Sequence, residues 1–219
     1  MMIEFYLFRH GETDWNLMGR MQGSADIPLN VRGMAQAESL RAFFDRVQAD
    51  PRFNSKDKLL QSIVSSPLLR ARETVRIALR LPETDAELIR TDKRFAETHM
   101  GQAEGMTRDE LVGNFGEEVW NHWISLGHES WGAKFPDGET KGEVRDRALQ
   151  VLADLVRETE TSDHARIWFV ATHGGLLRRL LHHFHPQEII PIDVVNGAVF
   201  KFVYHQGGWS VGKTPIHLP

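Results

Sequence analysis

Short apolar runs alternate along the chain with longer segments whose apolar residues recur at helical spacing. Residues 3–8 and 167–171 form nearly continuous apolar runs, as expected for buried inner strands, and residues 62–64 form a shorter one. The last strand candidates are residues 189–195 and 198–204. Strands that alternate with helices favour a three-layer αβα sandwich around a mainly parallel sheet, so we predict an α/β fold.

Helices are expected between these runs. Residues 33–50 and 139–161 show amphipathic spacing, and residues 50–58 between the first helix and the second strand read as a polar connection. Residues 106–138 have looser spacing, which indicates one or two short helices followed by a loop. Another helix should begin near Pro67, with one apolar face made of Leu68, Leu69, Val75, Ala78 and Leu79.

Two of the predicted strands end in a histidine followed by glycine. Arg9, His10 and Gly11 follow the first run, where the glycine is expected to allow a sharp turn, and His173 follows the 167–171 run. Ligands bind at the carboxyl ends of strands in open α/β sheets, so both imidazoles should face a cleft. The alternative is an incidental histidine beside a surface ion pair between Arg9 and Glu12.

Arg70 is expected in the first turn of the helix that starts near Pro67. A cation is unfavourable at the positive end of a helix dipole unless an anion neutralises both. This position therefore indicates an anion site, and an ordinary solvated arginine is the alternative.

These motifs together resemble the histidine phosphatase superfamily, in the branch of cofactor-dependent phosphoglycerate mutases and small broad-specificity phosphatases. The resemblance runs from residue 5 to about residue 198 and implies a phosphoglycerate mutase-like fold. The departures are Glu73, where glutamine is usual, and Asp137, where glycine is usual. The matching pieces are RHGETDWN at 9–16, GRMQG at 19–23 with Asp26, Pro28 and Leu29, SSPLLRARET at 65–74, Glu97 with Gly101, PDGET at 136–140 and ATHGG at 171–175.

The resemblance implies a role for each residue of the site. His10 would attack phosphorus and carry a phosphohistidine, while Arg9, Arg70 and His173 would surround the phosphoryl oxygens. Glu97 would protonate the leaving oxygen and then accept a proton from water. Further contacts to phosphate or substrate are expected from Thr13, Asn16, Gln22 and Gly23.

A metal site is the competing chemistry for two histidines and a carboxylate. Two arginines aimed at the same point would repel a divalent cation, so we expect neither a metal nor any other cofactor. The run His182, His183 and His185 precedes Pro186 at a helix end, where solvated surface histidines are the expectation.

Composition is that of an ordinary globular domain. The chain has 219 residues, a formal net charge of −4 and no cysteine. We therefore expect one domain over residues 1–219 with a cap-like insertion at about 98–140, no nucleic-acid partner and no thiol chemistry. No apolar run is long enough to span a bilayer and the N-terminus lacks a signal pattern, so a cytoplasmic enzyme for a small phosphate ester is predicted, with a homodimer left open.

The charged residues in 98–140 distinguish between a phosphatase and a mutase. The family's mutases carry paired arginines and a lysine there, whereas this segment has only Arg108 and Lys134. A phosphatase is therefore favoured over a mutase, and a pseudoenzyme that only binds phosphate is disfavoured because His10 and Glu97 are present. The aromatic residues of the segment suit a partly apolar leaving group, although they also suit a core. Its eight acids are expected to repel a polyanion. They are Glu104, Asp109, Glu110, Glu117, Glu118, Glu129, Asp137 and Glu139.

Overall fold

A computed structural model describes residues 1–53, 55–162, 165–187 and 193–216. Its sheet has the strand order β3-β2-β4-β1-β5-β6. Neighbours from β3 through β1 pair in parallel, whereas β5 is antiparallel to both β1 and β6. The predicted mainly parallel sheet is thus confirmed. The strands are β1 (Met2–Arg9), β2 (Ile63–Ser65), β3 (Arg90–Thr91), β4 (Ile167–Thr172), β5 (Val199–His205) and β6 (Gly208–Val211).

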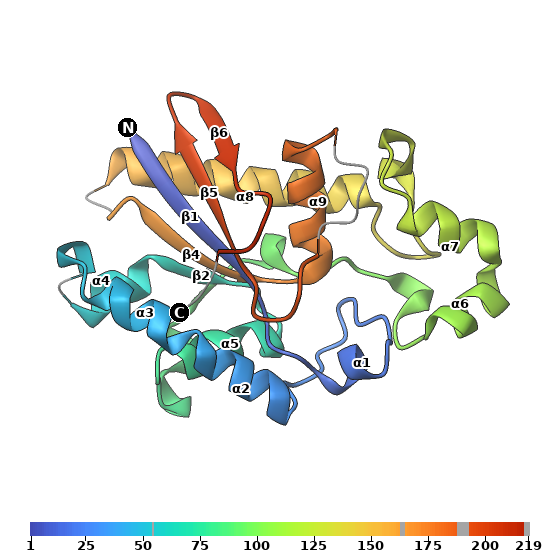
Figure 1. Cartoon of the computed structure of the whole chain (residues 1–219), viewed down its shortest axis with the longest axis horizontal. Helices are drawn as coiled ribbons and strands as arrows, with labels where there is room; N and C mark the ends of the chain where they lie inside the picture. Colours follow the sequence, from blue (N-terminus) through green and yellow to red (C-terminus); the bar gives the residue numbers. More distant parts are fainter. Residues whose placement is uncertain (54, 163–164, 188–192, 217–219) are drawn as a thin grey trace.

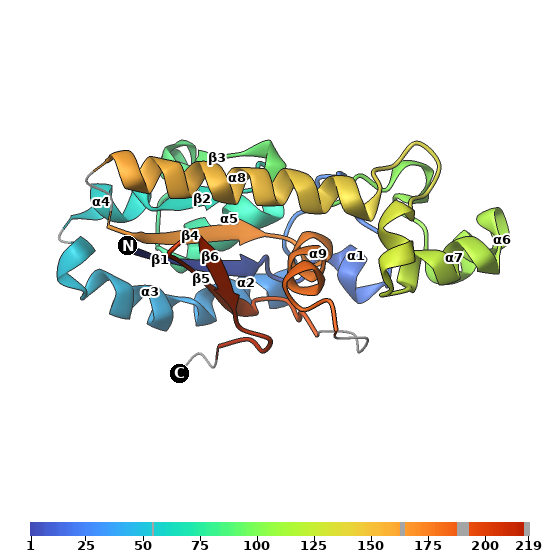
Figure 2. The same cartoon turned by 90° about the horizontal axis from the view of Figure 1, so that it is seen from above.

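Helices cover both faces of the sheet. Figures 1 and 2 show α8 and α9 on one side and α2, α3 and α5 on the other. No helix in the described ranges is long and apolar enough to cross a membrane. The α-helices are α1 (Asp14–Leu17), α2 (Val31–Ser39), α3 (Arg41–Gln48), α4 (Lys56–Gln61), α5 (Leu69–Ala78), α6 (Arg108–Phe115), α7 (Glu117–Ile124), α8 (Lys141–Thr161) and α9 (Gly174–Phe184). Short 3-10 helices are η1 (Pro51–Phe53), η2 (Glu83–Leu88), η3 (Lys93–Phe95), η4 (Gly101–Ala103) and η5 (His128–Gly132).

Alternation along the inner strands divides the core into two layers. On β4, Trp168 and Val170 join the cluster under α8 and α9, whereas Phe169 and Ala171 join the cluster under α3 and α5. Successive side chains of a strand point to opposite faces, so a strand that is buried on both faces must be apolar throughout. This explains why the 167–171 run is continuous and why all six residues of β4 are buried.

Four local predictions were wrong. The helix expected over 33–50 is divided at Leu40, whose N–H bonds back to Ala37 and tightens the turn. The connection expected at 50–58 contains η1 and the start of α4. Leu69 is 37% exposed, so the apolar face of α5 is made by Ala71, Val75 and Ala78 instead.

The fourth error concerns the end of the strand expected at 189–195. Residues 189–192 lie outside the described residues, and residues 193–195 are a loop. The carbonyl of Val194 accepts a hydrogen bond from the side chain of Arg9, through Nη1 at 2.7 Å. The strand predicted at 198–204 is confirmed as β5.

Residues 98–140 pack around a small core of their own. It contains Met100, Ala103, Leu111, Trp123, Ala133 and Phe135. Figure 1 shows α6 and α7 beyond the end of the sheet toward which β1 and β4 point, next to α9. The predicted pair of short helices is present, and the segment stands at the carboxyl ends of the parallel strands.

Candidate active site

The sequence motifs converge on one cleft at the carboxyl ends of the parallel strands. Its volume is about 230 Å³. Seven of the nine predicted site residues line it: Arg9, His10, Asn16, Gln22, Gly23, Arg70 and Glu97. The other two, Thr13 and His173, are fully buried and lie outside the lining.

The ring orientation of His10 is fixed by its neighbour. His10 Nδ1 lies 2.6 Å from the carbonyl oxygen of Gly11. Because a carbonyl only accepts, Nδ1 must carry the proton, and the lone pair of the neutral ring is on Nε2. Burial, and then the charges of Arg70 and Arg9, hold the pKa of His10 well below its usual range. The imidazole is therefore neutral and carries a free lone pair at neutral pH.

Gly11 is required for a close approach, not for the sharp turn that the sequence suggested. Its φ is not positive, but a Cβ added there would lie 2.3 Å from the carbonyl oxygen of Gly33 in α2. The Gly11 N–H donates to Thr74 Oγ1 at 3.0 Å. The loop that carries His10 is thus fixed between α2 and α5.

His173 lies behind His10 and is fully buried. The two ring centroids are 5.1 Å apart, and His173 Nε2 is 2.7 Å from Ser66 Oγ. Its Nδ1 has no hydrogen-bond partner among the described residues. Burial, followed by the charge of Arg70, lowers the pKa of His173 well below its usual range.

Thr13 has a local role in place of the expected ligand contact. Its hydroxyl caps α1 by accepting the Asn16 N–H at 3.2 Å. Asn16 Oδ1 also accepts a hydrogen bond from Asn196 Nδ2, which in turn donates to the His10 carbonyl. Thr13 therefore orients Asn16, which does line the cleft.

Arg9 and Arg70 bring positive charge into the cleft, and neither forms an ion pair with another described residue. Arg70 is fully buried and donates to the carbonyls of Gly23 and Ala25 at 2.8 and 2.7 Å, and its Nε has no partner in the described structure. Burial, and then Arg178, lower the pKa of Arg9 to about 10. Backbone carbonyls hold the guanidinium groups in place but do not neutralise them, so an anion is needed between them.

Glu97 is held at the N-terminus of α9. Its carboxylate accepts N–H groups of Thr98 and Gly175 at 2.8 and 2.9 Å, and of Leu176 at 3.2 Å. These donors fix the position of the carboxylate at the wall of the cleft. A Cβ at Gly175 would lie 2.2 Å from Glu97 Oε1, so only glycine allows this approach.

Arg147, which was not predicted from the sequence, holds the backbone of the Glu97 loop. Arg147 donates to the carbonyls of Arg94, Ala96 and Glu97 at 2.7–3.0 Å and pairs with Glu139 at 2.8 Å. It belongs to the long helix α8, whose inward apolar face was correctly predicted. Nothing in the sequence distinguishes this arginine from its solvated neighbours.

Arg178 and Arg179 were also not predicted, and they line the cleft from the second turn of α9. Their spacing from Gly174 and Gly175 is four residues, so each lies on the same helix face as one of these glycines. This four-residue spacing is the sequence feature that could have identified both arginines as lining residues. The remaining lining residues that were not predicted are Arg20, Met21, Met100, Trp120, Trp123, Gly174 and Gly175.

The eight acids of residues 98–140 would have to line the cleft in order to repel a polyanion there, as the sequence suggested. None of the eight lines the cleft. Glu104 accepts the Ser24 N–H, Glu110 pairs with Arg20, and the others lie at caps, in ion pairs or in solvent. The segment instead contributes Met100, Trp120 and Trp123, so its wall of the cleft is apolar and uncharged.

The histidines at the end of α9 were only partly predicted. His182 is 6% exposed, so the expectation of a solvated surface residue was wrong for it, whereas His183 is exposed. Its position on the inward face of α9, beside Leu181, explains the burial. Within the described ranges, no group of three or more His, Asp or Glu residues is placed to hold a metal ion.

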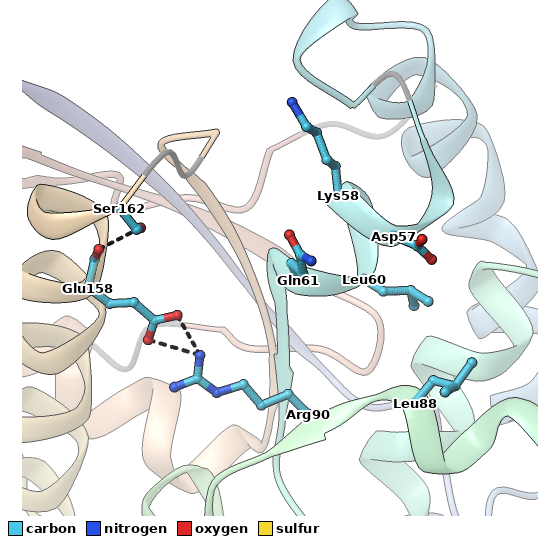
Figure 3. A pocket seen from close by; sticks show the side chains of 8 residues that line it. All are labelled: Asp57, Lys58, Leu60, Gln61, Leu88, Arg90, Glu158 and Ser162. Carbon is cyan, nitrogen blue, oxygen red and sulfur yellow. Dashed lines mark hydrogen bonds and ion pairs between the residues drawn. The ribbon is translucent and has the colours of Figure 1, made fainter.

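A larger cavity of about 770 Å³ lies at the opposite edge of the sheet, around the amino ends of β2 and β3. Figure 3 shows that an ion pair between Arg90 and Glu158 lies on one side of it. The described residues that line it include neither a histidine nor a second arginine. Volume alone therefore does not identify the functional site.

Comparisons with known proteins agree with this geometry. A family model described as histidine phosphatase superfamily (branch 1) matches residues 5–215. The uncharacterized phosphatase PhoE of Bacillus subtilis is 29% identical over 210 residues, which are 94% of this chain and 90% of that protein. The 2,3-bisphosphoglycerate-dependent phosphoglycerate mutase 2 of Gloeobacter violaceus is 26% identical over 92% of this chain and 86% of its own length. The solved structure of Bacillus stearothermophilus YhfR is similar with a TM-score of 0.74 at 28% identity, covering 95% of this chain and 94% of that one.

Burial of His10 predicts a pH-dependent stability. As pH falls through about 6.5, the unfolded chain binds protons on its histidines, whereas the folded protein leaves His10 neutral. The free energy of unfolding should therefore decrease below pH 6.5, by up to about 1.4 kcal/mol per pH unit for each such histidine. Urea denaturation between pH 7.5 and 5 should give a shallower decrease for His10→Ala. Replacement of the exposed His205 by alanine is the control, and equal slopes for wild type and His10→Ala would contradict this account.

Proposed function

The chain belongs to the histidine phosphatase superfamily, and from this premise we propose that it is a phosphomonoester hydrolase that works through a phosphohistidine at His10. The observation that supports it most is the tautomer of His10. Its Nδ1–H is bonded to the Gly11 carbonyl, so the Nε2 lone pair is the nucleophile available in a cleft that Arg9 and Arg70 make positive.

The first step forms a P–N bond and breaks the ester P–O bond. Arg9 and Arg70 stabilise the negative charge that spreads over the phosphoryl oxygens, and their fork geometry suits two oxygens each. Glu97 acts as the general acid and gives its proton to the leaving oxygen.

The second step returns the enzyme to its starting state. Glu97, now a carboxylate, takes a proton from a water molecule whose oxygen attacks phosphorus and breaks the P–N bond. The imidazole leaves in its neutral form, because Nδ1 keeps its proton on the Gly11 carbonyl and burial of the ring disfavours the charged form. Inorganic phosphate and the alcohol are the products.

Hydrolysis is favoured over mutase chemistry by the number of anion sites. A phosphoglycerate mutase must hold a carboxylate and a second phosphate while it returns the phosphoryl group. Beyond Arg9 and Arg70, the cleft has the neighbours Arg178 and Arg179, while Arg20 is paired with Glu110. These charges suffice for one further anion, and the 98–140 wall offers only apolar side chains. Relatives of both kinds are known, so this choice rests on the cleft itself.

The phosphoenzyme is the direct test. His10→Ala should lower the rate of phosphate release by roughly a thousandfold or more, because the covalent route is lost. Wild-type protein incubated with a ³²P-labelled ester and quenched in alkali should carry acid-labile label on the peptide that contains His10. His183→Ala, at an exposed histidine, is the matched control. Label on another residue would refute the assignment.

Glu97→Gln should slow turnover roughly 100- to 10,000-fold on an alkyl phosphate, since glutamine cannot exchange a proton. With p-nitrophenyl phosphate the leaving group needs no proton, so the first step should survive and the second should fail. We expect a burst of nitrophenolate near one equivalent per site, followed by slow turnover. Glu118→Gln, at an exposed acid, should behave as wild type. Unchanged steady-state rates on both esters would remove Glu97 from the mechanism.

Phosphate release should exceed mutase activity, and it should not depend on a divalent metal. The measurement compares phosphate release from 3-phosphoglycerate with its conversion to 2-phosphoglycerate in the presence of 2,3-bisphosphoglycerate, with and without a chelator. Faster interconversion would replace the hydrolase by a mutase. Activity lost on chelation and restored by one divalent ion would show that the arginines do not supply the required charge.

A further inference from the structure

Arg179 is a buried cation that the proposed phosphoryl chemistry does not use. It is 8% exposed, it lines the cleft, and its Nε is buried without a hydrogen-bond partner in the described part of the chain. Burial lowers its pKa to about 10. An arginine that is buried, charged and unpaired is costly, and it is retained where a ligand supplies the missing anion.

The surroundings of Arg179 contain a second basic group, Lys141, and no paired carboxylate among the described residues. Its guanidinium carbon lies 5.0 Å from the centroid of the Trp123 ring, and Lys141 Nζ lies 5.6 Å from the same centroid. Lys141 donates to the carbonyls of Ser125 and His122, and burial, followed by Arg179, lowers its pKa to about 7. Trp123 holds Arg179 in place through cation–π contact, but no carboxylate of the described residues pairs with it.

Glu97 does not fill this role. Its negative charge raises the pKa of Arg179, but its oxygens accept the N–H groups of Gly175 and Leu176 at the start of α9 and the N–H group of Thr98. Arg178 connects the two ends of the cleft electrostatically, because its charge lowers the pKa of both Arg9 and Arg179. The positive charge thus continues from the phosphoryl position along α9.

We infer that Arg179, together with Arg178, forms a second anion subsite that binds a carboxylate or phosphate on the alcohol part of the substrate. This inference rests on the proposed hydrolase and narrows its substrates to phosphomonoesters with a second acidic group. The subsite is one helical turn, about 5.4 Å, beyond the residues that hold Glu97. The two acidic groups should therefore be separated by a short chain. Trp120 and Trp123 would pack against that chain.

Two esters that differ in one group test the subsite. 3-Phosphoglycerate and glycerol 3-phosphate differ only in a carboxylate against a hydroxymethyl group. Wild type should prefer the acid, and Arg179→Met should lower the ratio of the two kcat/KM values at least tenfold, mainly through KM. Arg179→Lys should recover part of the ratio because it restores the charge. The pair fructose 1,6-bisphosphate and fructose 6-phosphate tests a second phosphate in the same way.

The control is Arg145→Met. Arg145 also stacks on a tryptophan, with its guanidinium carbon 4.6 Å from the Trp131 centroid, but it pairs with Asp146 and lies outside the cleft. It should leave both ratios unchanged. Thermal unfolding shows whether Arg179→Met is folded. If it is not, Arg178→Met, at the half-buried neighbour, must instead lower one of the two ratios of kcat/KM values. Ratios that stay constant in every folded variant would overturn the subsite.

Binding separates this inference from the proposed function. Calorimetric titration of 3-phosphoglycerate into His10→Ala requires no turnover, and adding Arg179→Met should weaken that affinity at least tenfold. If wild type hydrolyses no ester but this loss is found, the hydrolase is wrong and the subsite remains. If hydrolysis is found but neither the affinity nor the ratios respond, the subsite is wrong and the hydrolase remains.

Discussion

Uncompensated positive charge at the carboxyl ends of the parallel strands is the constraint on which the rest of the cleft depends. Among the described residues, five arginines line it beside a single carboxylate, and two of them are nearly or fully buried. The carbonyl of Val194 solvates the guanidinium group of Arg9, and those of Gly23 and Ala25 solvate that of Arg70, without cancelling their charge. Because an anion completes the neutralisation, ligand binding and the local stability of this edge of the sheet are linked.

Helix α9 organises that charge in two turns. Its first turn presents the N–H groups that fix Glu97, and Gly175 leaves room for the carboxylate. Its second turn presents Arg178 and Arg179. The Glu97 carboxylate is therefore positioned by the same rigid element that carries the two arginines, and their spacing is set by the helical repeat instead of by loops.

The sequence predicted correctly the features that depend on the order of residues along the chain. It failed where the direction in which a side chain points matters. A histidine that follows an apolar strand must lie at the edge of the sheet, so the position of His10 follows from the order of residues alone. The acids of residues 98–140 could be counted but not oriented, and none of them lines the cleft. Leu40 shows the same limit on a smaller scale, because amphipathic spacing continues across a turn where the hydrogen-bond pattern changes.

Arg147 has a mechanical consequence. One guanidinium group bonds three carbonyls of the loop that carries Glu97 and, through Glu139, the end of the 98–140 segment. A displacement of that segment cannot leave these bonds unchanged, so it also displaces the backbone of Glu97. Movement of the apolar wall and movement of the Glu97 carboxylate are thus coupled, and a single side chain on α8 is the mechanical link between them.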